Sequence, residues 1–202
     1  MSDKNSNIAF IVGNGKSRQT IDLSTLVGKG TIFGCNALYR NFNNFDYLVA
    51  IDNRMIQELI EVTTSDSNNM SGEVIIPPED ERWESVEYSP HRRRSNAGMN
   101  AMLEAIRRGH NVLYCLGFDF ILEGEKSIEN IYRGTKNYEP NTQSNTSDNY
   151  FRVRYCDWFV NQHDDVKFVF VVPDDIATKK LESKNIIGMK MSTFNNKIKG
   201  TS

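Results

Sequence analysis

The sequence predicts an α/β fold: a Rossmann-like, doubly wound and mainly parallel sheet with helices on both faces and a lid-like insertion. Two patterns predict it. Short apolar runs recur along the chain and nearly every one ends in a polar loop, and segments between them carry apolar residues at helical spacing. Runs that are apolar on both sides are typical of parallel strands covered by helices. Alternation of strand with helix is the doubly wound order.

Five apolar runs are expected to form the main strands of this sheet. They span residues 8–12, 31–35, 47–51, 112–116 and 167–172. A sixth run, residues 73–76, ends at two prolines and is expected to be a more peripheral strand.

Three helices are predicted between the strands. The first two carry apolar residues on one helical face: Met55, Ile56, Leu59 and Ile60, then Met99, Met102, Leu103 and Ile106. Gly109 follows the second helix and is expected to stop it. The third helix covers about residues 151–162, with its apolar side toward the core.

The length of 202 residues predicts one domain. We assign residues 1–187 to a single α/β domain. Within it, residues 121–149 are polar with isolated tyrosines, and a stretch of this length is expected to be a lid-like insertion. Residues 188–202 carry scattered lysines and are expected to form a loose C-terminal tail.

Charge and composition exclude several classes of function. The net charge is −2, so no global cationic field favours nucleic acid or an anionic membrane. No apolar run approaches the ~20 residues that span a bilayer, and the polar N-terminus does not resemble a signal peptide. Cys35, Cys115 and Cys156 are expected to be buried thiols of a reducing compartment. These features predict a cytoplasmic protein.

The residues that follow the strands are the first candidates for a ligand site, because open parallel sheets bind ligands at the carboxyl ends of their strands. Those residues are small, polar or acidic: Gly13, Asn14, Gly15, Ser17, Asn36, Asp52, Asn53, Gly117 and Asp119. This clustering is the strongest functional signal in the sequence.

The first of these loops is rich in glycine. Gly13 and Gly15 lack side chains, so their backbone N–H groups are expected to approach a nucleotide phosphate. Ser17 adds a hydroxyl donor or caps the next turn. The P-loop pattern is absent, and Arg18 stands where the Rossmann fingerprint has its third glycine. The alternative interpretation is a tight strand-to-helix turn.

Other polar residues admit two interpretations each. Asn36 and Asp52 are suited to hydrogen-bond a ribose or a base edge, and the carboxylate also suits a metal, but both residues are equally suited to cap the following helix. Ser95, Asn96 and Gly98 open a strong helix. There, Ser95 or Asn96 is a candidate cap, while the helix N-terminus itself attracts negative charge.

Three arginines precede this helix. A guanidinium group binds phosphate or carboxylate in a bidentate manner, so Arg94 is a candidate for an anion clamp. For Arg92 and Arg93 a solvated surface run is the default interpretation, and for Arg94 the two interpretations are closer. No histidine is placed as a clear general base, and no metal-ligand spacing stands out.

Four segments, read in order, resemble one family. They are FIVGNGKS with the following IDLSTL, then FGCNALYR, AIDNRM, and RRRSNAGMNAMLEAIRRGHNVLYCLGFDF. They are similar to the compact bacterial sialyltransferases that use a CMP-linked sugar, and to related proteins similar to 6-hydroxymethylpterin diphosphokinase. The resemblance covers approximately residues 8–172, with gaps in the loops.

The resemblance implies roles for individual residues. Gly13, Asn14, Gly15 and Asn36 would contact the phosphate and sugar of a nucleotide. Asp52 stands where the family has an asparagine.

The resemblance extends to the helix that follows the three arginines and to the strand after it. Arg94 and Asn96 occupy places of donor-binding residues. The turn at Gly117 and Asp119 would border the nucleoside.

The chain also departs from the family pattern. The family's catalytic histidine has no counterpart, and Asp148 in that region is the candidate base. One family tyrosine falls at Ile121, while the other is matched in the insertion by Tyr132 or Tyr138. Tyr138, with Arg94 and Asp148, is our candidate for the catalytic groups.

The predicted function is that of a glycosyltransferase that moves a sugar from a CMP-linked type of donor to an unknown hydroxyl acceptor, with no required cofactor. A surface glycan or a modified nucleic acid would suit as acceptor, and the small size would suit a phage-encoded protein. Two alternatives stay open. One is a Mg-dependent pyrophosphokinase or phosphotransferase, with Asp52 or Asp119 near the metal. The other is a non-catalytic nucleotide-binding protein. The sequence leaves open whether the chain forms a homo-oligomer.

Overall fold

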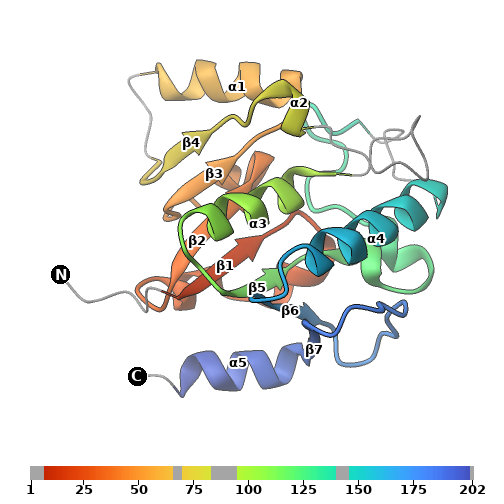
Figure 1. Ribbon diagram of the computed structural model, residues 1–202. Helices are drawn as coiled ribbons and strands as arrows, with labels where there is room; N and C mark the ends of the chain where they lie inside the picture. The colour runs from red at the N-terminus through yellow and green to blue at the C-terminus, as the bar shows by residue number, and fades with distance from the viewer. Residues whose placement is uncertain (1–6, 66–69, 83–94, 140–145, 201–202) are drawn as a thin grey trace.

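The computed structural model describes residues 7–65, 70–82, 95–139 and 146–200, without the side chains of residues 146–148. Within these ranges, seven strands form one sheet in the order β4-β3-β2-β1-β5-β6-β7. Every neighbouring pair of strands is parallel. The fold is therefore α/β and Rossmann-like, which confirms the predicted fold class (Figure 1).

The elements follow one another from β1 to α5. The strands are β1 (Ile8–Val12), β2 (Thr31–Cys35), β3 (Tyr47–Val49), β4 (Glu73–Ile75), β5 (Val112–Leu116), β6 (Lys167–Val172) and β7 (Ile186–Lys190). The α-helices are α1 (Asn53–Thr63), α2 (Glu79–Arg82), α3 (Ala97–Arg107), α4 (Thr146–Asn161) and α5 (Met191–Lys199). Short 3-10 helices are η1 (Lys16–Thr20), η2 (Leu23–Leu26), η3 (Asn36–Arg40), η4 (Asp119–Ile121) and η5 (Gly124–Ile128).

The six predicted strands are present, although β3 ends two residues early, at Val49. The second predicted helix is α3, and Gly109 stops it with a φ of 86°, a conformation that glycine adopts without strain. The third, α4, begins at Thr146 rather than near residue 151.

The expectation of a loose tail over residues 188–202 is wrong for residues 188–199, while residues 201 and 202 lie outside the described residues. Ile186–Lys190 is the edge strand β7, paired with β6, and α5 follows it directly. Helix α5 buries Met191, Phe194 and Ile198 against the sheet. The spacing of these three residues is the i, i+3, i+7 pattern of a helix face. The sequence therefore contained a signal for this helix, but the lysines of the segment favoured the interpretation of a solvated tail.

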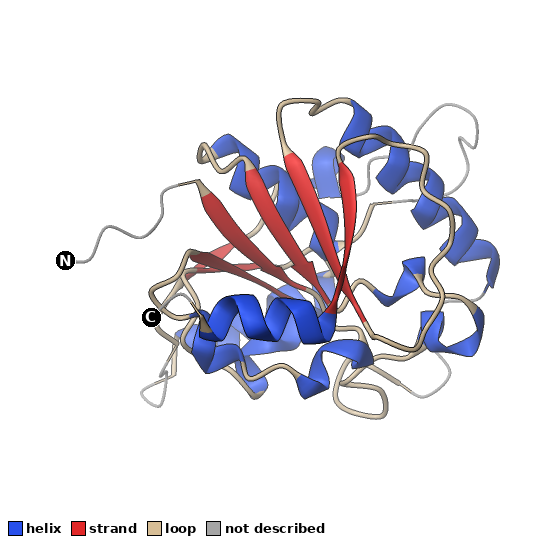
Figure 2. Ribbon diagram, turned by 90° about the horizontal axis from the view of Figure 1, so that it is seen from below, coloured by secondary structure: helices blue, strands red, loops and turns tan. Residues whose placement is uncertain are grey.

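The sheet separates two apolar clusters. In β1, Ala9 and Ile11 pack on the side of α3 and α4, whereas Phe10 and Val12 pack on the side of α1 and α5. Such alternation follows from the two-residue period of a strand. Figure 2 shows the twisted sheet between helices on its two sides.

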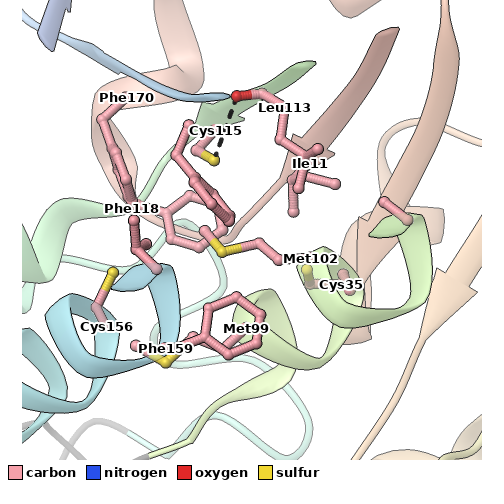
Figure 3. Close-up of a cluster of buried hydrophobic side chains, with 14 of the residues drawn as sticks. Ile11, Cys35, Met99, Met102, Leu113, Cys115, Phe118, Cys156, Phe159 and Phe170 are labelled. Carbon is pink, nitrogen blue, oxygen red and sulfur yellow. Dashed lines mark hydrogen bonds between the residues drawn. The ribbon is translucent and has the colours of Figure 1, made fainter. Parts of the chain in front are cut away.

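All three cysteines are free thiols and lie in the cluster between the sheet and helices α3 and α4 (Figure 3). Burial raises the pKa of Cys35 to about 12, and it also raises the pKa of Cys115 and of Cys156. The predicted buried thiols are confirmed. A search of the described helices finds none with the length and apolar character needed to cross a bilayer.

Candidate functional site

The direction in which strands are added to the sheet reverses at β1. This strand pairs with β2 on one side and with β5 on the other. Such a switch point leaves a crevice beyond the carboxyl ends of the strands. A cavity of about 280 Å³ lies there, walled by the loops that follow β1, β2, β3 and β5, the start of α3, the insertion and α4.

This cavity brings together most of the residues that the sequence nominates. Its wall includes Gly13, Asn14, Gly15, Asn36, Asp52, Ser95, Asn96, Gly98, Gly117, Asp119 and Tyr138. Ser17 and Asn53 do not line it: Ser17 hydrogen-bonds to Asp119, and the Oδ1 of Asn53 accepts from Arg82 at 3.1 Å. Arg94 and the side chain of Asp148 lie outside the described residues.

The glycine loop is built differently from what its sequence suggests. The N–H of Gly13 donates to the carbonyl of Leu116 at 2.8 Å, and the N–H of Gly15 donates to the carbonyl of Gly117 at 2.9 Å. The expectation that these two amides bind a phosphate is therefore wrong. Within the described part of the chain, the amide of Asn14 is the loop N–H that has no hydrogen-bond partner.

The glycines are required by close packing instead. A Cβ atom on Gly15 would lie 2.4 Å from the carboxyl carbon of Asp119 and 2.5 Å from the carbonyl oxygen of Gly117. A Cβ atom on Gly13 would lie 2.7 Å from the same carbonyl oxygen. The loop after β1 thus rests directly on the turn after β5.

Asp119 holds that arrangement. Its carboxylate accepts hydrogen bonds from the amide of Ser17 at 2.9 Å, from the hydroxyl of Ser17 and from the amide of Lys16. Burial raises the pKa of Asp119, while these bonds act in the opposite direction. Both oxygens of Asp119 are already engaged, and no group of three or more His, Cys, Asp or Glu side chains gathers among the described residues in a way that suits a metal.

Asn36 and Asp52 face each other at the ends of β2 and β3. Asn36 is 8% exposed and has a φ of 48°, a left-handed conformation that asparagine tolerates better than most residues. Its Nδ2 donates to Oδ2 of Asp52 at 3.4 Å. The capping alternative is wrong for both residues, because Cys35 is the N-cap of η3 and the Asp52 side chain makes no capping bond at α1.

The surroundings of Asp52, which keeps part of its surface open to solvent, perturb the ionisation of its carboxyl group. Desolvation raises the pKa of Asp52, partly offset by the Asn36 hydrogen bond and the positive charge of Arg152. A carboxylate that lies at a helix start, makes no cap and lines a cavity is available to a ligand.

Two buried acceptor atoms near Asp52 lack partners. The Oδ1 atoms of Asn14 and Asn36 are shielded from solvent and accept no hydrogen bond from any described residue. A buried unsatisfied polar atom costs about 1–3 kcal/mol. Hydrogen-bond donors on a ligand would recover that cost.

Tyr138 reaches the same part of the cavity from the insertion. Its hydroxyl oxygen accepts from Nδ2 of Asn14 at 3.2 Å. Burial and the negative charge of Asp52 raise the pKa of Tyr138, so the phenol stays protonated and can donate. Tyr132, the other candidate, is not among the residues that line the cavity. Its hydroxyl oxygen accepts from Nη2 of Arg18 at 2.9 Å, and its hydroxyl group donates to Oδ1 of Asn41.

The start of α3 forms another part of the wall. Asn96 is the N-cap, and its side chain accepts from the amide of Met99 at 3.0 Å, which bears out the capping interpretation. The side chain of Ser95 accepts from Nδ2 of Asn100 at 3.0 Å. The partial positive charge of this helix end therefore lies at the cavity.

The described part of the insertion is attached to the body by several contacts. The amide of Ile131 donates to the carbonyl of Asn14 at 3.0 Å, and Gly15 and Asn130 form an antiparallel bridge. Farther along, Nδ2 of Asn137 donates to Glu58 at 2.6 Å. The cavity is closed on this side by backbone pairing as well as by side chains.

Three residues at or beneath the site were not among the candidates predicted from the sequence. Asn149 and Arg152 of α4 line the cavity and are joined by a 3.1 Å hydrogen bond. Their i, i+3 spacing was a usable signal, but placing the helix start near residue 151 concealed it. Arg18 is 2% exposed and donates from Nε to the carbonyl of Gly13 at 2.6 Å, so it supports the loop from below.

Comparison with protein-family models gives no match, and comparison with curated protein sequences gives none either. Among solved structures, the chain is similar to the sialyltransferase CST-II in complex with trisaccharide acceptor and CMP. The TM-score is 0.49 and the identity 13%, over 95% of this chain and 98% of that chain. A single-residue mutant of the α-2,3/8-sialyltransferase CstII gives a TM-score of 0.46 at 13% identity, over 94% and 99%. The interpretation of the site rests on this chain's own residues.

Proposed function

We propose that the chain binds a nucleotide-linked sugar, of the CMP-linked type, in this cavity and transfers the sugar to a hydroxyl acceptor. One observation carries the proposal: the cavity at the switch point of the sheet combines a helix N-terminus with amide and phenol groups. This set suits a phosphate flanked by a sugar and a base. The motif resemblance to sialyltransferases supports the same donor type.

The binding roles follow from the wall of the cavity. The backbone N–H of Asn14 and the N-terminus of α3 provide partial positive charge for the phosphate. The side-chain acceptors of Asn14 and Asn36 suit donors on the nucleoside or the sugar. Arg94, which directly precedes Ser95 in the chain, is proposed to complete the phosphate contact.

The reaction moves one electron pair at each of two bonds. The bond between the sugar carbon and the phosphate oxygen breaks, and its electron pair stays with the phosphate. The acceptor oxygen forms the new bond to the carbon and gives up its proton. Tyr138 is proposed to donate a hydrogen bond to the leaving phosphate as negative charge develops there. Asp148 is proposed to receive the acceptor's proton.

The test starts with nucleotide binding. The chain is titrated with CMP, with UDP and with ATP in the presence of Mg²⁺, and heat and thermal shift are recorded. We expect CMP to bind without a metal and to raise the melting temperature. The chain is then incubated with CMP-, UDP- and GDP-linked sugars plus an oligosaccharide mixture, and free nucleotide and extended oligosaccharide are measured.

Each result has a defined meaning for the proposal. Release of nucleotide that depends on acceptor supports transfer. Metal-dependent binding of ATP without binding of CMP would replace the proposal with phosphoryl transfer. Tight CMP binding with no release from any donor would identify a non-catalytic nucleotide-binding protein. No binding of any nucleotide would overturn the proposal altogether.

A further inference from the structure

One corner of the cavity is rich in hydrogen-bond acceptors. The buried Oδ1 atoms of Asn14 and Asn36 have no partner in the described part of the chain. The carboxylate of Asp52 stands beside them, at 3.4 Å from Nδ2 of Asn36. A group that enters this corner meets these three acceptors beside the hydroxyl of Tyr138, and donors on the group would satisfy the acceptor atoms that have no partner.

Asp52 differs from the other acidic residues of the described cavity wall. Asp119 is bound by the amide and hydroxyl of Ser17. Glu129 lies 3.4 Å from Lys126, and Glu139 lies 3.6 Å from Arg54.

For Asp52, by contrast, no described cation lies within ion-pair distance, and Nδ2 of Asn36 is its hydrogen-bond donor. Its position at the start of α1 does not occupy it either, because it makes no capping bond. Asp52 therefore lines the cavity without an ion pair to a described residue, although the positive charge of Arg152, another residue of the cavity wall, acts on it from a longer distance.

We propose that Asp52 determines the class of donor sugar: one that presents hydroxyl or amino groups to this corner, and not a carboxylate. The inference rests on the proposed function, because it concerns the sugar of the same bound donor. It departs from the sialyltransferases that the motifs resemble, since a sialic acid carries a carboxylate.

The physical reason is the sign of the charge. Two carboxylates in one partly desolvated corner repel each other, and neither can donate a hydrogen bond to the other while ionised. A sugar hydroxyl donates to Asp52 or to Asn36 Oδ1 and satisfies an acceptor that is otherwise unpaired. An ammonium group adds charge attraction to the same contact.

The test uses donors that differ in one carboxylate alone. The first pair is CMP-N-acetylneuraminate and its methyl ester, and the second is UDP-glucuronate and UDP-glucose. Dissociation constants are measured for the unmodified protein and for Asp52→Asn, which keeps the size of the side chain. Asp52→Ser serves as a second variant, and thermal unfolding confirms that each variant is folded.

We expect the unmodified protein to bind the uncharged member of each pair about tenfold more tightly or better, which is about 1.4 kcal/mol. In Asp52→Asn and Asp52→Ser the ratio should fall to about threefold or less. Glu61→Gln is the matched control, because Glu61 lies on α1, the helix that follows Asp52, is exposed and pairs with Lys136. It removes the same charge outside the cavity and should keep the original ratio.

Equal affinity of the unmodified protein for both members of a pair would overturn the inference, as would a ratio that Asp52→Asn leaves unchanged. Neither result would contradict the proposed function, because CMP binding is measured separately. Absence of CMP binding in the unmodified protein would instead overturn the proposed function, and the inference with it.

Discussion

Ser17 donates both its backbone N–H, at 2.9 Å, and its hydroxyl group to the buried carboxylate of Asp119, which lies 102 positions later in the chain. These bonds tie the loop after β1 to the turn after β5, on the two strands that flank the switch point. The shape of the cavity floor therefore depends on the contact between Ser17 and Asp119, which forms without a ligand.

The first prediction concerns this contact. Asp119→Asn replaces one of the two carboxylate oxygens by an NH2 group, which cannot accept, so one of the two bonds from Ser17 is lost. The substitution should lower the free energy of unfolding by about 2 kcal/mol. Asp22→Asn is the matched control, since Asp22 accepts from the amide and hydroxyl of Ser24 in the same way but on the surface. Its cost should be below about 0.5 kcal/mol, because asparagine caps as well as aspartate. Urea unfolding of both variants measures the difference, and equal costs would contradict the importance of burial here.

A second prediction concerns the steric role of Gly15. Gly15→Ala places a methyl group against Asp119 and the Gly117 carbonyl and should destabilise the protein by about 2 kcal/mol or more. Gly188→Ala is the control, because no atom lies within 4 Å of the added Cβ and φ lies outside the left-handed region. That variant should be neutral or slightly stabilising, by about 0.5 kcal/mol. Thermal unfolding checks both, and a harmless Gly15→Ala would show that the loop can move away from the turn.

The third prediction is a pH dependence. Burial acts to raise the pKa of Glu58, but hydrogen bonds from Tyr39 and Arg40 outweigh it and hold the pKa below its ordinary value of 4.5. The folded protein thus binds this proton less readily than the unfolded chain. The stabilisation is complete above about pH 4.5 and is lost as the pH falls through the lower, folded value.

Glu58→Gln should therefore cost about 3 kcal/mol at pH 7, since the Glu58 side chain is 6% exposed and lies 2.6 Å from Arg40. The loss should shrink as the pH falls below about 4.5, because the unfolded chain then takes up the proton before the folded protein does. Urea unfolding at pH 7 and pH 3.5 measures it. A difference between the two proteins that does not change with pH would contradict the assignment.

The fourth prediction concerns Tyr138 and depends on the proposed transfer. Tyr138→Phe removes the phenol donor and should lower the rate of sugar transfer about 100-fold, while CMP affinity changes by about threefold or less. Tyr150→Phe is the control, because Tyr150 is 58% exposed and does not line the cavity. Single-turnover measurements separate binding from transfer. An equal rate in both variants would remove Tyr138 from the catalytic groups.

Much of the architecture was predictable, because buried parallel strands such as β1 and β6 are nearly continuous apolar runs. The edge strand β7 was not. Its residues are all exposed or half-exposed, with Ile187 36% exposed, and its strand conformation depends on pairing with β6 rather than on its own apolar pattern. Edge strands of this kind carry a weak local signal.

The membership of the site was predictable for a topological reason: residues that follow parallel strands meet at one edge of the sheet. Their orientations were not. The sequence does not reveal that the amides of Gly13 and Gly15 turn toward β5, or that Asp52 leaves its capping position unused. Both depend on contacts with residues more than ten positions away.

The three cysteines give the molecule a built-in reporter of its global opening. A thiol reacts with disulfide reagents as the thiolate, and Cys35, Cys115 and Cys156 are at most 2% exposed with raised pKa values. Their labelling rate in native buffer therefore measures how often the core between the sheet and helices α3 and α4 separates. Because Cys35 also lines the cavity, the other two thiols are the clean reporters. A ligand that binds only the folded chain should slow the reactions of Cys115 and Cys156 together, so mass spectrometry detects binding without any engineered probe.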